Sequence, residues 1–280
     1  MNIPWKLKSR AFRLLSRLPG GALYFVQRHV TRRSRVDIRM IHEGWKYHRE
    51  AVERTGAKRL IEFGAGKTLA QNLYLSDLLD LQEVVDLNPM MELGMVNEAI
   101  VQLVALGASL DGRPVRSAAE LEEIYGIRYR APFDMRATGH QDASFDICVS
   151  TNTLEHVPRD DIAAIFTELR RILRPDGRVS AMIDYSDHYA HSDRSLSRLH
   201  YLTLSETEWQ RHNHANHYQN RLRHGHYADI FASTGFAVLS DEPTDYADPA
   251  GLALRDELCT GAPTDFATTG FWQLTPDDAG

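Results

Sequence analysis

The sequence is poor in cysteine and contains no long hydrophobic run. Its two cysteines, Cys148 and Cys259, are far apart, and Cys148 falls within a predicted buried strand. This usage is typical of a reducing compartment, argues against a disulfide framework, and forms no cysteine metal motif. The most apolar stretches have the length of strands, and none approaches the length needed to cross a bilayer. We therefore expect a cytoplasmic protein.

The formal net charge of -6 conceals an uneven distribution. Among residues 1–39 the lysines and arginines face a single acidic residue, Asp37, so the rest of the chain is strongly acidic. An acidic main body argues against a broad nucleic-acid-binding surface. Apolar residues from Trp5 to Leu18 recur at helical spacing, which predicts a basic amphipathic helix. Two interpretations stay open: residues 1–20 bind an external anionic surface, either a membrane at the inner face or an acidic patch on a partner, or the helix packs on the protein's own body.

Strand-sized apolar runs alternate with helical patterns along most of the chain. With 280 residues and 43% apolar composition, the chain can bury one substantial core. The alternation predicts an α/β fold: a Rossmann-like, doubly wound, seven-stranded sheet, mostly parallel with an antiparallel C-terminal edge, plus N-terminal helices and a helical lid. The expected strands are 59–63, 83–87, 127–129, 145–150, 178–183, 236–239 and 267–274, and the main expected helices are 36–56, 69–79, 91–106, 118–125 and 160–173.

The same patterns divide the chain into four parts. We expect basic amphipathic N-terminal helices in 1–56, a cofactor-binding core in 57–185, a helical lid over the acceptor in 186–235, and strands that complete the sheet in 236–280.

The first expected strand ends in an acid and two spaced glycines, within residues 59–66. Such a strand turns tightly into a helix whose N-terminal amides can face a ligand. Asp86, at the tip of the next strand, is placed to accept both ribose hydroxyls of a nucleotide. A phosphate-binding loop would need glycine where Ile61 stands, and a dinucleotide fingerprint would need it where Leu69 stands. The pattern indicates an adenosine-containing cofactor.

Two later segments carry a family resemblance. Residues 142–157, with the letters Leu154-Glu-His156, and residues 166–177, which end in Pro-Asp-Gly, resemble the class I methyltransferases that depend on S-adenosyl-L-methionine. The resemblance covers roughly residues 57–185. Asp176 departs from the family's usual Pro-Gly-Gly, but the three residues still form a turn.

The resemblance implies S-adenosyl-L-methionine as the cofactor and assigns residues to it. Glu62 and the two glycines match the family's loop around the methionine part and ribose, and Asp86 matches its ribose acid. Asp134 and the Met135 amide match the position that reads the adenine. Thr68 stands where many members have a third glycine. The implied cofactor-binding residues are Glu62, Gly64, Gly66, Asp86, Asp134, Met135 and Thr151.

Acceptor chemistry is expected just beyond the strand that ends at Ile183. Open parallel sheets bind their ligands at the carboxyl ends of the strands, and the sequence there reads Asp-Tyr-Ser-Asp-His-Tyr-Ala-His. His188 is the leading candidate for a general base. The alternatives are a divalent metal site, which we do not predict, and a solvated loop. Glu155 and His156 either begin the next helix or take part in catalysis. The candidate catalytic residues are His188, Asp184 and His156.

Together these features predict an O-methyltransferase that acts on a polar small molecule or a saccharide. Arg221 and Arg223 are expected to pair with a carboxylate or phosphate of that acceptor. A weaker resemblance, in the stretch around Asp184 to His191, is to methyltransferases that modify glycans. Two alternatives remain: a catalytically reduced cofactor-binding partner protein tethered to the membrane, and an NAD(P)-dependent oxidoreductase.

Overall fold

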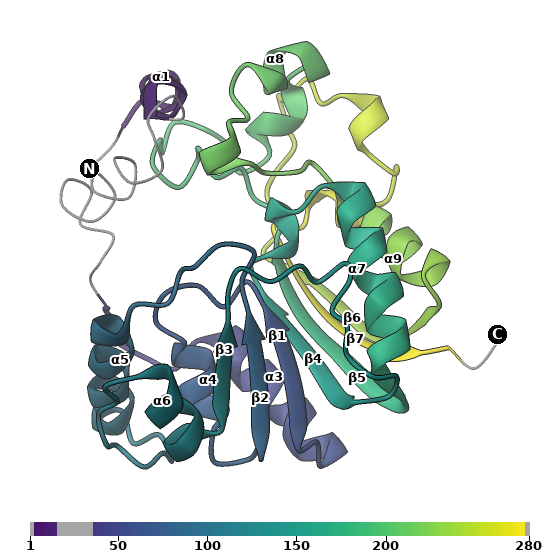
Figure 1. Ribbon diagram of the computed structural model, residues 1–280. Helices are drawn as coiled ribbons and strands as arrows, with labels where there is room; N and C mark the ends of the chain where they lie inside the picture. The colour runs from purple at the N-terminus through teal and green to yellow at the C-terminus, as the bar shows by residue number, and fades with distance from the viewer. Residues whose placement is uncertain (1–2, 16–35, 278–280) are drawn as a thin grey trace.

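The chain folds around one seven-stranded β-sheet (Figure 1). The computed structural model describes residues 3–15 and 36–277. The strand order is β3-β2-β1-β4-β5-β7-β6, and β1 to β5 pair in parallel. β7 is antiparallel to both β5 and β6. The predicted fold class is confirmed. The strands are β1 (Arg59–Phe63), β2 (Leu81–Val85), β3 (Ile127–Arg130), β4 (Phe145–Thr151), β5 (Leu173–Asp184), β6 (Phe236–Thr244) and β7 (Thr269–Pro276).

Helices cover both faces of the sheet (Figure 1). Successive side chains of a strand point to opposite faces, and β4 shows the consequence. Val149 packs with α3 on one face, while its neighbour Cys148 packs with α7 and α9 on the other. Both side chains are fully buried, so the sheet has apolar layers on each side. The helices of these layers and of the β3 edge are α3 (Glu43–Thr55), α4 (Ala70–Leu75), α5 (Leu93–Ala105), α6 (Ala118–Tyr125), α7 (Arg159–Ile172) and α9 (His224–Ser233).

Several helix ends follow from local sequence. Ser117 caps α6 by accepting a hydrogen bond from the Glu120 amide, and Gly126 ends the helix with a left-handed φ of 67°. α3 begins at residue 43 rather than at 36 as predicted, because the His42 side chain caps it by accepting from the Gly44 amide. These caps fix where the backbone enters and leaves the layers.

Two predicted boundaries next to the cofactor motif differ from the structure. The helix expected over 69–79 is the short α4, because Leu69 adopts a left-handed φ of 48° directly before it. The strand expected over 83–87 is β2, two residues earlier. Asp86 therefore stands one residue beyond the strand end, in the loop at the carboxyl edge of the sheet.

Residues 185–223 form a cap above the carboxyl ends of the strands (Figure 1). The predicted lid is less helical than expected, since the cap holds only short helical segments. They are η2 (His200–Thr203), α8 (Glu206–Gln210) and η3 (Ala215–His217). Its apolar centre is built from Tyr189, Leu199, Tyr201, Leu202 and Trp209. The remaining short helical turns of the chain are η1 (Leu154–His156), η4 (Asp256–Leu258) and η5 (Pro263–Phe266).

The N-terminal helix α1 (Trp5–Leu15) packs on the cap. Its Trp5 backbone amide donates to Asp193 at 2.8 Å, and its Phe12 ring stacks on His217 with centroids 4.4 Å apart. Of the two predicted roles for this helix, packing on the body is confirmed for this face. Leu7 and Leu14 remain 59% and 65% exposed on another. Leu18 and the rest of the expected helix lie outside the described residues.

No helix in the described ranges combines the length and the apolarity needed to cross a membrane.

Candidate functional site

The predicted site residues gather where β1, β2, β4 and β5 end. The parallel strand order reverses direction between β1 and β4, so the loops that follow these two strands diverge and leave a crevice. Open α/β sheets bind ligands at such a point. A cavity of about 230 Å³ opens there. Residues at the ends of β1 and β2 and in the turn after β4 line it, including Gly64, Val85 and Thr153.

Glu62 and the glycines form one wall of this region. The Glu62 side chain is 3% exposed and accepts a hydrogen bond from Asn72 Nδ2 at 2.7 Å. Burial raises the pKa of Glu62 to about 8, although hydrogen bonds from Asn72 and Gln71 act in the opposite direction. Gly64 and Gly66 have φ values of 77° and 72°, which residues other than glycine adopt only at a cost in free energy. The loop conformation therefore depends on both glycines.

At Gly64 the loop backbone also lies very close to the side chain of Thr153. A Cβ atom at Gly64 would lie 2.3 Å from Cγ2 of Thr153, while a Cβ at Gly66 would meet no atom within 4 Å. Gly66 thus leaves open space in front of the loop, as an approaching ligand requires.

Asp86 is held in place by a neighbouring strand. Its Oδ2 accepts from the Tyr129 hydroxyl at 2.8 Å, and its Oδ1 lies 3.5 Å from the Gly66 amide. The same tyrosine oxygen accepts from the Met90 and Met91 amides. Burial raises the pKa of Asp86, and the hydrogen bond from Tyr129 partly offsets this effect. One oxygen is firmly oriented, and the other makes only a long contact.

The predicted adenine residues lie at the other end of the cavity. Asp134 and Met135 both line it. Met135 is 5% exposed, whereas the Asp134 carboxylate reaches solvent and pairs with Arg136 at 2.7 Å. Of the implied cofactor residues, Gly64, Asp134 and Met135 line this cavity, while Asp86 lies in the adjoining loop beside Gly66. Their contact with a cofactor stays a prediction.

Thr151 belongs to a buried polar chain behind the loop. Its hydroxyl donates to Gln71 at 2.6 Å and accepts from Nε2 of His48 at 2.8 Å. His48 is fully buried on α3, and its Nδ1 accepts from Ser180 at 2.7 Å. Burial lowers the pKa of His48 to about 3, so the ring is neutral. Gln273 on β7 extends the chain by donating to Ser180.

The candidate catalytic residues meet on the cap side of the cavity. His188 Nε2 lies 3.3 Å from Asp184 Oδ2, and the His188 ring is 4.9 Å from the His156 ring between centroids. His156 also lines the cavity, so it joins the cofactor side to this cluster. Burial opposes ionisation of Asp184, but hydrogen bonds from His188 and Ser186 outweigh it and lower its pKa. Burial lowers the pKa of His156.

Other residues predicted for the acceptor are structural. Asp187 is fully buried, accepts from the Tyr189 amide at 2.7 Å and pairs with His200 at 3.0 Å. Arg223 is also fully buried, and its guanidinium donates to the carbonyls of Tyr185, Asp265 and Ala267. The prediction that Arg223 binds the acceptor is wrong, because its donors are already used inside the protein.

Arg221 has a similar position. Its side chain is 5% exposed, donates to the Leu204 carbonyl at 2.5 Å and pairs with Glu206. It ties two parts of the cap together, and its predicted pairing with the acceptor is not supported by this arrangement.

Sequence reasoning missed Tyr129 and Asn72, and it left the role of Glu155 open between a helix start and catalysis. Tyr129 orients Asp86, and Asn72 holds Glu62. Glu155 is 2% exposed, yet neither carboxylate oxygen has a hydrogen-bond partner among the described residues. The only available signal for Tyr129 was its place at the end of the strand beside Asp86. A one-dimensional pattern does not show that Glu155 turns inward.

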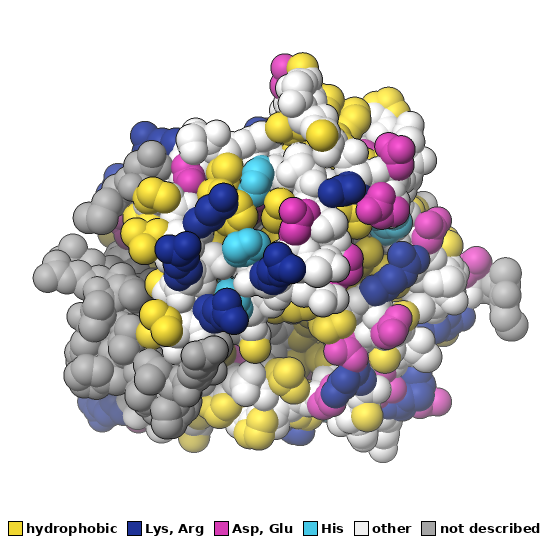
Figure 2. All heavy atoms as spheres, turned by 90° about the horizontal axis from the view of Figure 1, so that it is seen from above, with side chains coloured by type: hydrophobic (Ala, Val, Ile, Leu, Met, Phe, Trp, Pro, Cys, Tyr) yellow, Lys and Arg dark blue, Asp and Glu magenta, His cyan; other side chains and the backbone are white. Residues whose placement is uncertain are grey.

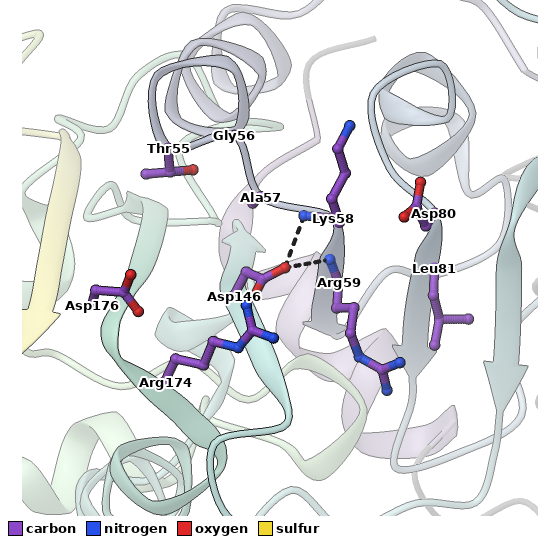
Figure 3. Close-up of a pocket in the computed structure, with 10 residues that line it drawn as sticks. All are labelled: Thr55, Gly56, Ala57, Lys58, Arg59, Asp80, Leu81, Asp146, Arg174 and Asp176. Carbon is purple, nitrogen blue, oxygen red and sulfur yellow. Dashed lines mark hydrogen bonds and ion pairs between the residues drawn. The ribbon is translucent and has the colours of Figure 1, made fainter.

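A different hollow lies at the opposite edge of the sheet (Figure 3). Asp146 there accepts hydrogen bonds from the amides of Lys58 and Arg59 at 2.8 Å and pairs with Arg174 at 2.6 Å. The figure shows Asp146 in the middle of these partners. Because this carboxylate already has partners and the amino edge carries none of the cofactor motif, the hollow is a structural feature.

The face above the strand ends is basic around its histidines. Figure 2 shows lysine and arginine side chains surrounding histidines on this face. α1 and the cap contribute exposed basic residues, among them Lys6, Arg10, Arg198 and Arg211. Such a surface attracts anionic molecules.

The loop and cavity suit an adenosine-containing sulfonium. Three features of the loop fit such a cofactor. There is open space in front of Gly66, a buried acid, Glu62, precedes Gly64, and one Asp86 oxygen makes only a long contact. A cofactor with a ribose diol and a positive charge meets these groups with complementary donors and charge.

Comparisons with known proteins agree with the fold. A family model described as a methyltransferase domain matches residues 104–181. No curated protein shows significant sequence similarity to the chain. The 1,6-didemethyltoxoflavin-N1-methyltransferase of Burkholderia thailandensis, solved with bound S-adenosylhomocysteine, aligns with a TM-score of 0.53 and 14% identity over 99% of this chain and 92% of that one. YcgJ of Bacillus subtilis aligns with a TM-score of 0.50 and 15% identity over 85% and 100%.

Proposed function

We propose that this chain is a class I S-adenosylmethionine-dependent methyltransferase that transfers a methyl group to a hydroxyl oxygen of a polar small molecule or saccharide. The enzyme class and the cofactor are supported by the methyltransferase-domain model that matches residues 104–181 and by a structural neighbour solved with bound S-adenosylhomocysteine. The oxygen acceptor, the residues in contact with each substrate and the cellular location are our proposals.

The cofactor is held by the residues that line the crevice. Glu62 and the Gly64–Gly66 loop face its methionine part, Asp86 accepts the ribose hydroxyls, and Asp134 with the Met135 amide reads the adenine. When bound, S-adenosylmethionine supplies an electrophilic methyl group on sulfur. The protein contributes mainly by holding the acceptor in line with that group.

The acceptor's proton is removed at the cluster beyond β5. The single observation that carries this proposal is the pairing of His188 with Asp184 at 3.3 Å, next to a histidine that lines the cofactor cavity. A hydroxyl placed between the cavity and the cluster gives its proton to His188, and Asp184 stabilises the resulting imidazolium. Only a hydroxyl acceptor needs such a base, because a neutral amine can attack before it loses its proton.

The charge of the upper face supports a polar, anionic acceptor. Lysines and arginines surround the histidines there, whereas the cavity itself is only moderately large (Figure 2). A phosphorylated or carboxylated sugar has the hydroxyls, the charge and the size that this surface favours. Glycan modification is consistent with this choice.

A screen with labelled methyl donor tests the proposal. We expect methyl transfer to sugars, nucleotide sugars or phenols, and a loss of about 100- to 10,000-fold in kcat for His188→Gln, as for removal of a general base. Binding of S-adenosylhomocysteine to this variant should be unchanged in calorimetry. His140→Gln, a histidine that pairs with Glu83 away from the cap, is the matched control. Transfer only to nitrogen acceptors, or full activity of His188→Gln, would contradict the hydroxyl-base assignment.

We also propose that α1 contacts an anionic membrane from the cytoplasmic side. Leu7, Ala11 and Leu14 are exposed at helical spacing, with Lys6 and Arg10 exposed beside them. Apolar side chains flanked by cations suit an anionic lipid surface. Flotation with phosphatidylglycerol vesicles should recover the protein, and Leu7→Asp should reduce recovery. Equal recovery with neutral phosphatidylcholine vesicles, or no effect of this substitution, would exclude this contact.

A further inference from the structure

Glu155 is buried without a partner beside two histidines. It belongs to the turn η1, directly after β4, and is 2% exposed. Both of its carboxylate oxygens lack a hydrogen-bond partner within the described ranges. An ionised carboxylate in this position is costly unless a cation or a proton compensates its charge. The turn itself is rigid, because Asn220 of the cap donates to the carbonyls of Leu154 and Val157.

The two histidines present their ring nitrogens to this carboxylate. Ligand atoms of Glu155, His156 and His188 all lie within 4.8 Å of one another. His156 Nδ1 donates to the Tyr218 carbonyl at 2.7 Å, which leaves the lone pair of Nε2 free to bind. Metal-binding histidines are commonly oriented by such a bond from the second ring nitrogen to a backbone carbonyl. His188 Nε2 is buried, and it lies 3.3 Å from Asp184 Oδ2 without the geometry of a well-formed hydrogen bond.

Asp184 brings a second carboxylate to the same place. Its Oδ2 lies 3.3 Å from His188 Nε2, and its charge acts on both Glu155 and His156. Two ligands bound side by side to one ion at about 2.1 Å are separated by about 3.0 to 3.4 Å. The separation of Asp184 and His188 already has this value. The ligand atoms of Glu155, His156 and His188 start within 4.8 Å of one another and need to approach by at most about 1.5 Å to reach such separations.

We propose that four side chains of this cluster bind one divalent transition-metal ion: Glu155, His156, Asp184 and His188.

The ligand set favours particular ions. Two imidazoles and two carboxylates carry a formal charge of about -2, which a divalent ion neutralises. Imidazole favours Zn²⁺, Fe²⁺ or Co²⁺ over Mg²⁺, which prefers oxygen ligands and retains its water. His191 is left out of the set, because its Nε2 is bonded to Ser186 at 2.8 Å and its ring is half exposed on the solvent side.

The ion would lie between the cap and the cofactor cavity. His156 takes part in both, so an acceptor hydroxyl bound to the ion would stand next to the methyl donor. A bound divalent ion would lower the pKa of such a hydroxyl, whose proton would pass to solvent. His188 would then serve as a ligand, and its role as the base belongs to the metal-free cluster. This role rests on the proposed function, but binding of the ion does not, and binding is measured without cofactor or acceptor.

Calorimetry on the full chain tests the site. The protein is first treated with a chelator, and Zn²⁺, Mn²⁺ and Mg²⁺ are then titrated separately in the absence of cofactor. We expect one ion per chain, bound most tightly for Zn²⁺ and least for Mg²⁺. Glu155→Gln keeps the size of the side chain and should weaken Zn²⁺ binding by about 100-fold or more, since it removes a charged ligand. Addition of Zn²⁺ should raise the melting temperature of the unmodified chain but not that of this variant.

Glu83→Gln is the matched control. Glu83 is also 2% exposed and also contacts a histidine, His140, but arginines 128 and 130 already compensate its charge. Its substitution should leave Zn²⁺ binding unchanged. The proposal is overturned if the unmodified chain binds no ion more tightly than about 1 mM, or if Glu155→Gln binds it equally well. Either result would leave Glu155 as a buried, protonated carboxyl.

The two proposals fail separately. A chain that binds Zn²⁺ through Glu155 but does not bind S-adenosylhomocysteine retains the metal site and loses the proposed function. A chain that binds S-adenosylhomocysteine but no ion does the reverse.

Discussion

Replacing Asp86 by alanine should weaken binding of S-adenosylhomocysteine by a predictable amount. Oδ2 is engaged by Tyr129 at 2.8 Å, while Oδ1 makes only a 3.5 Å contact to the Gly66 amide and is available to a ribose hydroxyl. A hydrogen bond to a charged group contributes about 1.5 to 3 kcal/mol. The dissociation constant should therefore rise about 10- to 150-fold, which isothermal titration calorimetry resolves.

Tyr129 provides a second, independent step in the same experiment. Tyr129→Phe removes the donor that orients the carboxylate and should raise the dissociation constant by about 2- to 10-fold, the effect of one neutral hydrogen bond. In the Asp86→Ala background the tyrosine has nothing to orient, so the second substitution should add almost nothing. Additive effects would show that Tyr129 does not act through Asp86.

Asp146→Ala controls for the general loss of a carboxylate. Asp146 lies at the opposite edge of the sheet, where it holds the amides of Lys58 and Arg59 (Figure 3). The dissociation constant of this variant should be unchanged if it remains folded, as judged by circular dichroism. An Asp86→Ala protein that binds S-adenosylhomocysteine as tightly as the unmodified chain would falsify the ribose assignment.

Three further predictions concern stability. The pKa of Glu62 is raised from 4.5 to about 8 by burial, so the folded state binds its proton more tightly than the unfolded state does. The free energy of unfolding should then fall as the pH rises from about 4.5 to 8, and this slope should be smaller in Glu62→Gln when both are unfolded with urea across that range. Gly64→Ala should destabilise the protein more than Gly66→Ala. Both positions have a positive φ, which costs alanine about 1 to 2 kcal/mol, but only a Cβ at position 64 meets Thr153. Equal free energies of unfolding in urea for the two variants would contradict the close approach of Thr153. Arg223→Met should cost about 3 to 5 kcal/mol in the same assay, since buried carbonyls lose their donor, and a near-neutral change would show that these carbonyls do not depend on the guanidinium.

The parallel core was predictable because its signals are local. Each strand of 57–185 is a short apolar run, and turn residues such as Gly126 mark where one element ends. Helix ends that depend on backbone conformation were harder, as Leu69 shows: nothing in its type indicates the left-handed φ that shortens α4.

The site residues likewise fall into those that the sequence predicted and those that it did not. Glu62, Asp86 and the glycines follow directly from a spacing that the backbone must satisfy, and the structure places them at the ends of β1 and β2, where Asp86 contacts the Gly66 amide. The roles of Arg223 and Glu155 were harder to predict, because residue type alone does not show whether a charged side chain points inward. Arg223 turns inward to bind carbonyls, and Glu155 turns inward without a hydrogen-bond partner among the described residues, although both types are usually found at the surface.

The position of α1 has a consequence for how the chain assembles during its synthesis. α1 leaves the ribosome long before its partners: Trp5 bonds to Asp193, 188 residues away, and Ser9 to His212, 203 residues away. At about 5 to 20 residues per second, roughly 10 to 40 s separate the two ends of these contacts. During that interval the parallel strands β1 to β5 can pair, while Trp5 and Phe12 have no surface to cover. The acceptor side is thus completed only after the parallel strands have been made, and the nascent chain carries an uncovered amphipathic helix until it is.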